Sequence, residues 1–225
     1  MKGTIAETYL RGRGITANLD LPALGFLATC YYRDEGDEKA RSLPGLDGHI
    51  SSINRTWLRP DGSGKAELPT PRKALGELNG HGVRFGIPGE VLAVGEGIET
   101  MLALRFVLPD MPMVAALSAN HLGTLLLPEG LQRLYIACDN DRTGLDAGLA
   151  ANRAHEQGIR SRLLVPATKD FNDDLQAFGF ETLLEWLQPH LWRGDQLTQL
   201  SANSGWREPC WIVMMTISSA SSFTL

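Results

Sequence analysis

The sequence predicts an α/β fold, in which a parallel sheet flanked by helices follows a smaller N-terminal α+β subdomain. From residue 91 onward, short apolar runs alternate with longer amphipathic runs, as expected of β-α-β units. The first 86 residues show short segments punctuated by Gly and Pro instead. The turn sequence GIPGE at 86–90 separates the two patterns. We therefore divide the chain into an N-terminal subdomain (1–86), an α/β domain (87–190) and an irregular tail (191–225).

The elements of the α/β domain follow from its apolar runs and stop signals. Pro109 ends the first helix, and Gly158 is a C-terminal stop for the third. The spacing of the apolar runs leaves room for a short crossover helix after each strand. The expected strands are 91–94, 111–117, 133–138 and 161–167, and the expected helices are 97–108, 120–127, 143–157 and 173–187.

The N-terminal subdomain and the tail are less regular. The subdomain is expected to hold a helix at 4–12 and antiparallel strands within 25–33, 49–59, 65–71 and 82–86. The tail combines the polar run GDQLTQLSANSGW with one isolated apolar run, CWIVMMTI. Because this run closes no further β-α unit, we expect the tail to be poorly ordered or peripheral.

Composition excludes several classes of protein. The chain has 225 residues, of which 43% are hydrophobic, enough for one ordinary core and a smaller unit. No segment reaches the roughly 20 apolar residues that cross a bilayer, and the start lacks a secretory apolar stretch, so we expect a cytoplasmic protein. Cys30, Cys138 and Cys210 are odd in number and far apart, which favours neither a disulfide framework nor a zinc ribbon.

The negative charge is concentrated in the α/β domain. The net charge is −5, which by itself argues against a nucleic-acid partner. Residues 1–86 carry 12 Lys and Arg against 10 Asp and Glu, whereas residues 87–190 carry 7 against 14. A solvated acidic surface explains this distribution as well as a site that binds divalent cations does. The positions of the acidic residues along the chain are needed to distinguish the two.

Acidic residues follow three of the predicted strands. Glu96 follows the first, Asp139 and Asp141 follow the third, and Asp170, Asp173 and Asp174 follow the fourth. Residues just past the carboxyl ends of parallel strands meet at one edge of the sheet, where ligands bind in open α/β folds. Mg²⁺ prefers carboxylate oxygens and keeps waters for substrate phosphates. The pattern predicts a magnesium site that acts on phosphate esters.

Each acidic segment alone has a structural explanation. An acid at a helix start is a favourable partner for the helix dipole, and DND before a helix is a common turn and N-cap. Their coincidence at consecutive strand ends favours the metal site, because like charges would otherwise repel one another without compensation. His81 and His121 have no metal-ligand spacing and are expected to be structural.

The segments VLAVGEGIET and IACDNDRTGLDAG resemble the two signature segments of the Toprim domain. That Rossmann-like domain is shared by DnaG-type primases, type IA and type II topoisomerases, and certain nucleases and recombination proteins. The resemblance implies that Glu96 is a general acid/base or metal ligand, and that Asp139 and Asp141 coordinate Mg²⁺, with Mn²⁺ as an alternative ion. It adds Asp170 and Asp173 as further metal candidates.

Within the Toprim proteins, the nearest resemblance is to the catalytic core of primases encoded by plasmids, phages and integrative elements. It rests on RTGLDAG, on the opening AETYLRGRGI and on a looser run that includes RTWL and DGSGKA, and it covers residues 4 to about 188. The zinc-binding and helicase-binding modules of full primases have no counterpart. A primase aspartate shortly after the glutamate is replaced, with Glu99 and Thr100 at the neighbouring positions.

Basic residues of the N-terminal subdomain are candidates to hold template and nucleotides opposite the acidic edge. Each of them is also explained as an ordinary solvated charge. Lys65 and Arg72 are the preferred pair, because Gly and Pro turns flank them. Gly97, Ser118 and Asn120 are expected to line the substrate site. The candidates of the N-terminal subdomain are Arg11, Arg13, Arg55, Arg59, Lys65, Arg72, Lys73 and Arg84, and Arg142 of the α/β domain is a further nucleic-acid or nucleotide-binding candidate.

The sequence is therefore interpreted as a primase-like nucleotidyltransferase that makes RNA primers on single-stranded DNA from nucleoside triphosphates, with a replicative or plasmid helicase as a candidate partner. Two alternatives stay open: a Toprim nuclease that uses the same metals, and a non-catalytic replication or recombination module. NTP-dependent labelling of oligoribonucleotides, DNA cleavage without NTPs, or the absence of both activities would separate the three.

Overall fold

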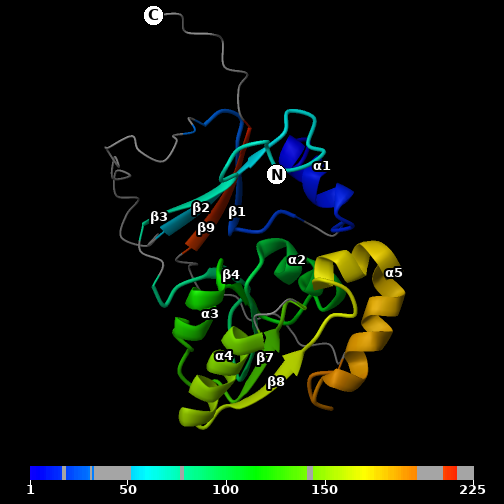
Figure 1. The fold of residues 1–225 in the computed structure, drawn as a ribbon. Helices are drawn as coiled ribbons and strands as arrows, with labels where there is room; N and C mark the ends of the chain where they lie inside the picture. The colour runs from blue at the N-terminus through cyan, green and yellow to red at the C-terminus, as the bar shows by residue number, and fades with distance from the viewer. Residues whose placement is uncertain are drawn as a thin grey trace, which may run out of the picture.

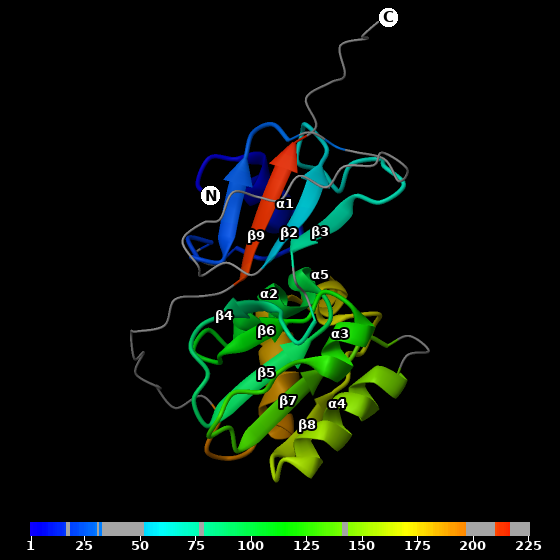
Figure 2. The same ribbon diagram turned by 90° about the vertical axis from the view of Figure 1, so that its left-hand side faces the viewer.

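The computed structural model describes residues 1–16, 19–30, 32, 52–76, 79–140, 144–196 and 210–216. Two sheets lie one above the other, with helices packed around the lower sheet and one helix behind the upper sheet (Figures 1 and 2). The lower sheet belongs to the predicted α/β domain, and the upper sheet is built mainly from the N-terminal subdomain.

The lower sheet has five strands in the order β4-β6-β5-β7-β8. Four of them are parallel, and β4 runs antiparallel to β6 at one edge. This arrangement confirms the predicted α/β fold, with the correction that the expected strand at 82–86 extends this sheet. The strands are β4 (Val83–Phe85), β5 (Val91–Gly95), β6 (Met113–Ala115), β7 (Arg133–Ala137) and β8 (Arg160–Leu164).

Helices cover both faces of the lower sheet, because the central strands β5, β6 and β7 carry buried apolar residues on both faces. One core lies between the sheet and α2 (Ile98–Val107) and α5 (Phe171–Leu187), and α5 is kinked at Gly179. A second core lies under α3 (Ala119–Thr124) and α4 (Gly144–Glu156). A short 3₁₀ helix, η1 (Gln188–His190), follows α5. None of the described helices has the length and apolar character needed to cross a membrane.

The upper sheet contains a strand from the tail. Its order is β1-β9-β2-β3, and β9 pairs in parallel with both β1 and β2 (Figure 2). The strands are β1 (Leu24–Leu27), β2 (Ser52–Leu58), β3 (Arg72–Gly76) and β9 (Cys210–Thr216). The expectation of an irregular tail is thus wrong for residues 210–216. The apolar run was isolated only along the sequence, and its pairing partners lie more than a hundred residues earlier in the chain.

A second correction concerns residues 65–71, which were expected to form a strand. Within this segment Lys65 makes an isolated bridge to Leu58, and the regular strand β3 begins only at Arg72. Pro69 and Pro71 account for the shift, because proline has no backbone N–H to donate to a sheet. Only β2 and β3 pair antiparallel, so the upper sheet is mixed rather than antiparallel.

The N-terminal subdomain shares a core with the α/β domain. In α1 (Ile5–Gly12), Tyr9 and Leu10 are buried in the same cluster as residues of α2 and α5. Asn172 of α5 is fully buried and donates to the backbone oxygen of Arg13 at 2.9 Å, while it accepts from the Arg13 guanidinium at 2.6 Å. Apolar burial and this paired hydrogen bond fix the two units against each other.

The start of the tail is also packed. Asp195 is 7% exposed and accepts from the Tyr135 hydroxyl at 2.8 Å and from Nε of Arg133 at 3.0 Å. The same Tyr135 oxygen accepts from the backbone N–H of Trp192 at 2.7 Å. These bonds attach residues 191–196 to β7, so this part of the tail is not peripheral.

Replacing Asp195 by alanine is expected to lower the free energy of unfolding by about 2 kcal/mol, since it leaves a buried hydroxyl and a largely buried guanidinium without their acceptor. Chemical denaturation with urea measures the change. Glu90→Ala is the matched control, because Glu90 is 63% exposed and lies 3.7 Å from the same Arg133. Equal effects of the two substitutions on stability would contradict the conclusion that Asp195 attaches residues 191–196 to β7.

Candidate metal and nucleic-acid site

The first two acidic segments meet at the carboxyl edge of the lower sheet. Gly95 at the end of β5 is in register with Ala137 at the end of β7. Glu96 comes one residue after the first, and Asp139 comes two residues after the second. Both acidic residues are partly buried. The parallel pairing therefore places them at the same edge, as the sequence predicted.

The third acidic segment is joined to the second by backbone hydrogen bonds. Cys138 donates to the Leu164 oxygen at 2.9 Å, and Asn140 donates to the Lys169 oxygen at 2.7 Å. The chain leaving β7 is thus held against the chain leaving β8 on both sides of Asp139. This places Asp170, the residue after Lys169, at the same edge of the sheet.

The three aspartates after β8 have different surroundings. Asp170 is the N-cap of α5, and its Oδ1 accepts from the backbone N–H groups of Asn172 and Asp173 at 2.8 and 2.9 Å. Asp174 is buried and accepts from the Thr168 hydroxyl and two backbone N–H groups of the preceding loop. Asp173 is partly exposed in the first turn. Asp174 therefore holds the loop, and Asp170 caps the helix whether or not it also binds a metal.

Substitution of Asp170 separates capping from metal binding. Asp170→Asn keeps a side-chain oxygen for the cap, whereas Asp170→Ala loses it and is expected to cost about 1 kcal/mol of stability. If Asp170 is also a ligand, both variants lose Mg²⁺ affinity to the same extent, measured by isothermal titration calorimetry. Normal Mg²⁺ affinity in Asp170→Asn would restrict Asp170 to the cap.

The end of β6 completes the edge with an unusual backbone. Leu117 has φ of 75°, a left-handed conformation that is energetically unfavourable for a bulky residue. Its backbone N–H donates to the backbone oxygen of Glu96 at 2.9 Å. Ser118 then caps α3 by accepting from the His121 N–H at 3.3 Å. Asn120 is exposed on that helix. Gly97 is the N-cap of α2, and a Cβ there would lie 2.8 Å from the Thr100 hydroxyl.

Glu96 and Asp139 offer carboxylate oxygens at this edge, the ligands that a hard divalent cation prefers. Asp141 lies outside the described residues. Among the described residues, no group of three or more His, Cys, Asp and Glu is close enough to hold a metal ion. Mg²⁺ is commonly held by one or two carboxylates together with waters and substrate phosphates, so this edge fits such a partial protein shell.

Three residues of the N-terminal subdomain converge on Glu99, in the first turn of α2. The Tyr9 hydroxyl donates to its Oε1 at 2.8 Å, Nζ of Lys65 lies 2.8 Å from the same oxygen, and a guanidinium nitrogen of Arg72 lies 3.9 Å from Oε2. Glu99 is 7% exposed. We call Tyr9, Lys65, Arg72 and Glu99 the interdomain ion cluster. Glu99 comes three residues after Glu96 in the chain, and Gly97, the N-cap of α2, lies between them.

Opposing effects set the ionisation of this cluster. Burial raises the pKa of Glu99, but the charge and hydrogen bond of Lys65, the charge of Arg72 and the Tyr9 hydroxyl outweigh it and lower that pKa to about 2. For Lys65, burial is the largest cause of a lowered pKa, the charge of Glu99 opposes it, and the charge of Arg72 adds to the lowering. The lowered pKa of Glu99 decides the charge state of the Glu99–Lys65 pair. Glu99 faces three donors, whereas a quarter of the Lys65 side chain stays in water. Glu99 is therefore ionised at neutral pH.

The other basic candidates lie elsewhere. Arg55 stacks on the ring of Trp57 at 5.3 Å, and Lys73 lies 4.4 Å from the Tyr32 ring centroid. Arg55 and Lys73 are cross-strand partners of β2 and β3, and Arg72, the neighbour of Lys73, points to the opposite face. Arg84 is on β4. Arg142 is outside the described residues. Of the described basic candidates, Lys65 and Arg72 face Glu99 in the first turn of α2, and Arg13 donates to Asn172 in the first turn of α5.

Comparison with known families agrees with this geometry. Residues 91–181 match the family model described as Toprim domain. The chain contains a Toprim domain. Residues 1–85 match the model of a domain of unknown function, DUF7146. No curated protein matches the chain.

The Toprim domain indicates a metal-dependent function on nucleic acids, and such domains bind divalent metals through acidic residues. This match confirms the family resemblance for the α/β domain. The interdomain ion cluster was not foreseen, although the sequence singled out three of its four members for other reasons. The role of Tyr9 could not be predicted from the sequence, because a tyrosine on an amphipathic helix is expected to be an ordinary core residue.

Proposed function

We propose that this protein is a primase-like nucleotidyltransferase that synthesises RNA primers on single-stranded DNA. One observation carries the proposal: Lys65 and Arg72, which lie outside the Toprim domain in sequence, stand within 4 Å of Glu99, in the first turn of the helix that follows Glu96. An enzyme that joins nucleotides needs cationic groups for the triphosphate opposite carboxylates that bind divalent cations. A Toprim domain with a basic subdomain docked at its carboxyl edge supplies both.

In this proposal the chain orients the reactants by charge. Glu96, Asp139 and Asp141 would hold Mg²⁺, which neutralises the triphosphate and polarises the attacked phosphate when bound. Lys65 and Arg72 contact the phosphate oxygens that the carboxylates repel, and Arg72 can do so in bidentate fashion. Glu99 positions both cations before substrate arrives. The 3′-hydroxyl of the primer then attacks the α-phosphate in line, and pyrophosphate leaves.

The test is primer synthesis by the full chain. Purified protein, single-stranded DNA, the four NTPs and Mg²⁺ are incubated with one labelled nucleotide, and the products are separated on a denaturing gel. Short oligoribonucleotides that require both NTPs and template are the expected result. Adding a preformed RNA primer separates extension from initiation, which matters because the resemblance includes no zinc-binding module.

Two other outcomes would replace the proposal. Cleavage of the DNA in Mg²⁺ without NTPs would assign the site to a nuclease. Folded protein that neither synthesises nor cleaves, with or without a primer, would assign the chain to a binding module. Lys65→Met tests the role of Lys65. If Lys65 contacts the triphosphate, this variant is expected to have a raised KM for NTPs. If the protein is a nuclease, the same variant is expected to lose affinity for DNA.

A further inference from the structure

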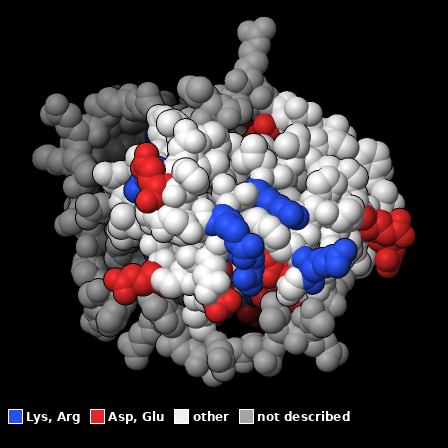
Figure 3. Space-filling view, turned by 90° about the horizontal axis from the view of Figure 1, so that it is seen from below, with Lys and Arg blue, Asp and Glu red and all other residues white. Residues whose placement is uncertain are grey.

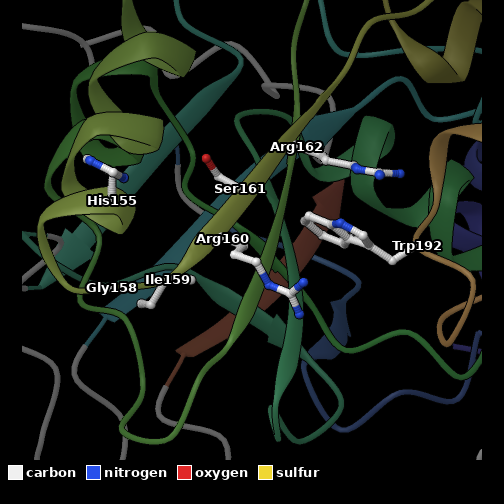
Figure 4. Close-up of a pocket in the computed structure, with 7 residues that line it drawn as sticks. All are labelled: His155, Gly158, Ile159, Arg160, Ser161, Arg162 and Trp192. Carbon is white, nitrogen blue, oxygen red and sulfur yellow. The ribbon is translucent and has the colours of Figure 1, made fainter.

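A pocket opens at the end of the lower sheet opposite the acidic edge. It has a volume of about 570 Å³ and is lined by residues of the last turn of α4, the α4–β8 turn, the first half of β8 and the segment after η1. This volume is within the range that accommodates a small organic ligand. Its lining residues are His155, Gly158, Ile159, Arg160, Ser161, Arg162 and Trp192 (Figure 4).

Two arginines flank one tryptophan in this pocket. The guanidinium carbon of Arg162 lies 4.5 Å from the Trp192 ring centroid, and that of Arg160 lies 5.6 Å from it. Figure 4 shows both side chains reaching toward Trp192, while Ser161 between them points away. This is the alternation of a β-strand. Arg162 also donates to the His190 oxygen at 3.1 Å, which holds its plane in place.

Trp192 is fixed in position by Tyr135 of β7. Its ring packs on Tyr135 with centroids 4.7 Å apart, and its backbone N–H donates to the Tyr135 hydroxyl. The nearby acid Asp195 is already paired with Tyr135 and Arg133. The pocket is therefore a fixed aromatic platform with guanidinium groups, one of which, Arg160, is on an exposed residue.

Strand β8 leads from this platform toward the acidic edge. Strand β8 is the edge strand of the lower sheet, and it rises about 17 Å over its five residues. Arg160 lies at its start and Arg162 at its middle, while the exposed Lys169 lies beyond its end, next to Asp170. Seen from below, Lys and Arg side chains lie near the middle of the molecule, with Asp and Glu side chains beside them (Figure 3).

We propose that the platform formed by Arg160, Arg162 and Trp192 binds single-stranded nucleic acid, and that the strand runs along β8 between this platform and the acidic edge. Arginine recognises phosphate oxygens, and bases stack on aromatic and guanidinium planes without regard to sequence. A duplex lacks exposed base faces, so the stacking surface favours a single strand. The inference rests on the proposed function for its ligand, because the strand bound here is the one that the acidic edge acts on.

The experiment measures binding of a fluorescein-labelled oligothymidylate to the full chain by fluorescence anisotropy in EDTA, so that the metal site does not contribute. Arg160→Ala is expected to weaken binding about tenfold and to reduce the slope of log K against log salt by about 0.7, one phosphate contact on a single strand. Trp192→Phe keeps a platform and is expected to bind nearly normally, whereas Trp192→Ala loses about tenfold or more.

Matched controls separate a site from general charge. Arg193→Ala removes one positive charge from an exposed residue beside Trp192 that does not line the pocket, and normal affinity is expected. Asp139→Asn is expected to keep oligothymidylate binding in EDTA while primer synthesis is lost, so a failure of the proposed function leaves this measurement intact. Circular dichroism verifies that Trp192→Ala is folded.

Three results would overturn the inference. The first is equal binding by Arg160→Ala and Arg193→Ala. The second is that polyglutamate displaces the labelled oligothymidylate as well as an unlabelled oligothymidylate of the same charge does, which would identify a surface for acidic proteins. The third is a preference for duplex over single-stranded DNA that Trp192→Ala leaves unchanged.

Discussion

Asp139→Asn is expected to lower Mg²⁺-dependent nucleotide incorporation on the order of 100-fold or more, because it removes the charge of a central carboxylate without changing its shape. Asp139 lies between two backbone hydrogen bonds that hold the β7 and β8 loops together, so the chain there stays in position when the side chain changes. Activity is measured at saturating NTP concentration to isolate kcat.

A readout without catalysis accompanies this prediction. Mg²⁺ should raise the Tm of the wild-type protein, because an ion that binds only the folded state stabilises it, and this shift should be absent in Asp139→Asn. Asp110→Asn is the control, since Asp110 is an exposed carboxylate at the opposite edge of the sheet, before β6. A normal Mg²⁺-dependent shift in Asp139→Asn would remove Asp139 from the metal site.

Glu99→Gln is expected to lower the free energy of unfolding by about 3 kcal/mol, because it leaves the largely buried Lys65 without its counter-charge. The double variant Glu99→Gln with Lys65→Met should be less damaged than the sum of the single variants, with a coupling of about 1–3 kcal/mol. Urea denaturation of the four proteins measures the cycle. Additive effects would show that the interdomain ion cluster does not hold the two units together.

The surface pair of Arg59 and Glu67 provides the matched control for this cycle. Its nitrogen and oxygen are 2.7 Å apart, close to the 2.8 Å of Lys65 and Glu99, but Glu67 is 82% exposed. Glu67→Gln is therefore expected to cost less than about 1 kcal/mol. The comparison isolates burial as the cause of the larger effect.

The pH dependence of stability provides a separate test of the same cluster. The pKa of Glu99 falls from 4.5 to about 2 in the folded protein. Because the folded pKa lies below the unfolded one, Glu99 stabilises the fold above pH 4.5, and this contribution is lost as pH falls from 4.5 toward 2. Wild-type and Glu99→Gln proteins should therefore converge in stability over that range. Parallel curves would contradict a charged Glu99.

The local pattern predicted most of the Toprim domain. Apolar runs of the right length placed β5, β6, β7 and β8, with α2 to α5 between and after them, because each run needs only its near neighbours to be recognised. The upper sheet was predicted less well. Its strand β9 pairs with segments more than a hundred residues away, and proline positions shifted β3 to a later start.

From the sequence alone, carboxylates could be placed at the ends of parallel strands, in segments that resemble a Toprim domain. This was possible because strand order and direction fix which residues meet at an edge. Only the tertiary structure decided what those groups face. The contacts of Glu99 with Lys65 and of Trp192 with Arg160 depend on how separate elements pack, and no periodicity along the chain records that packing.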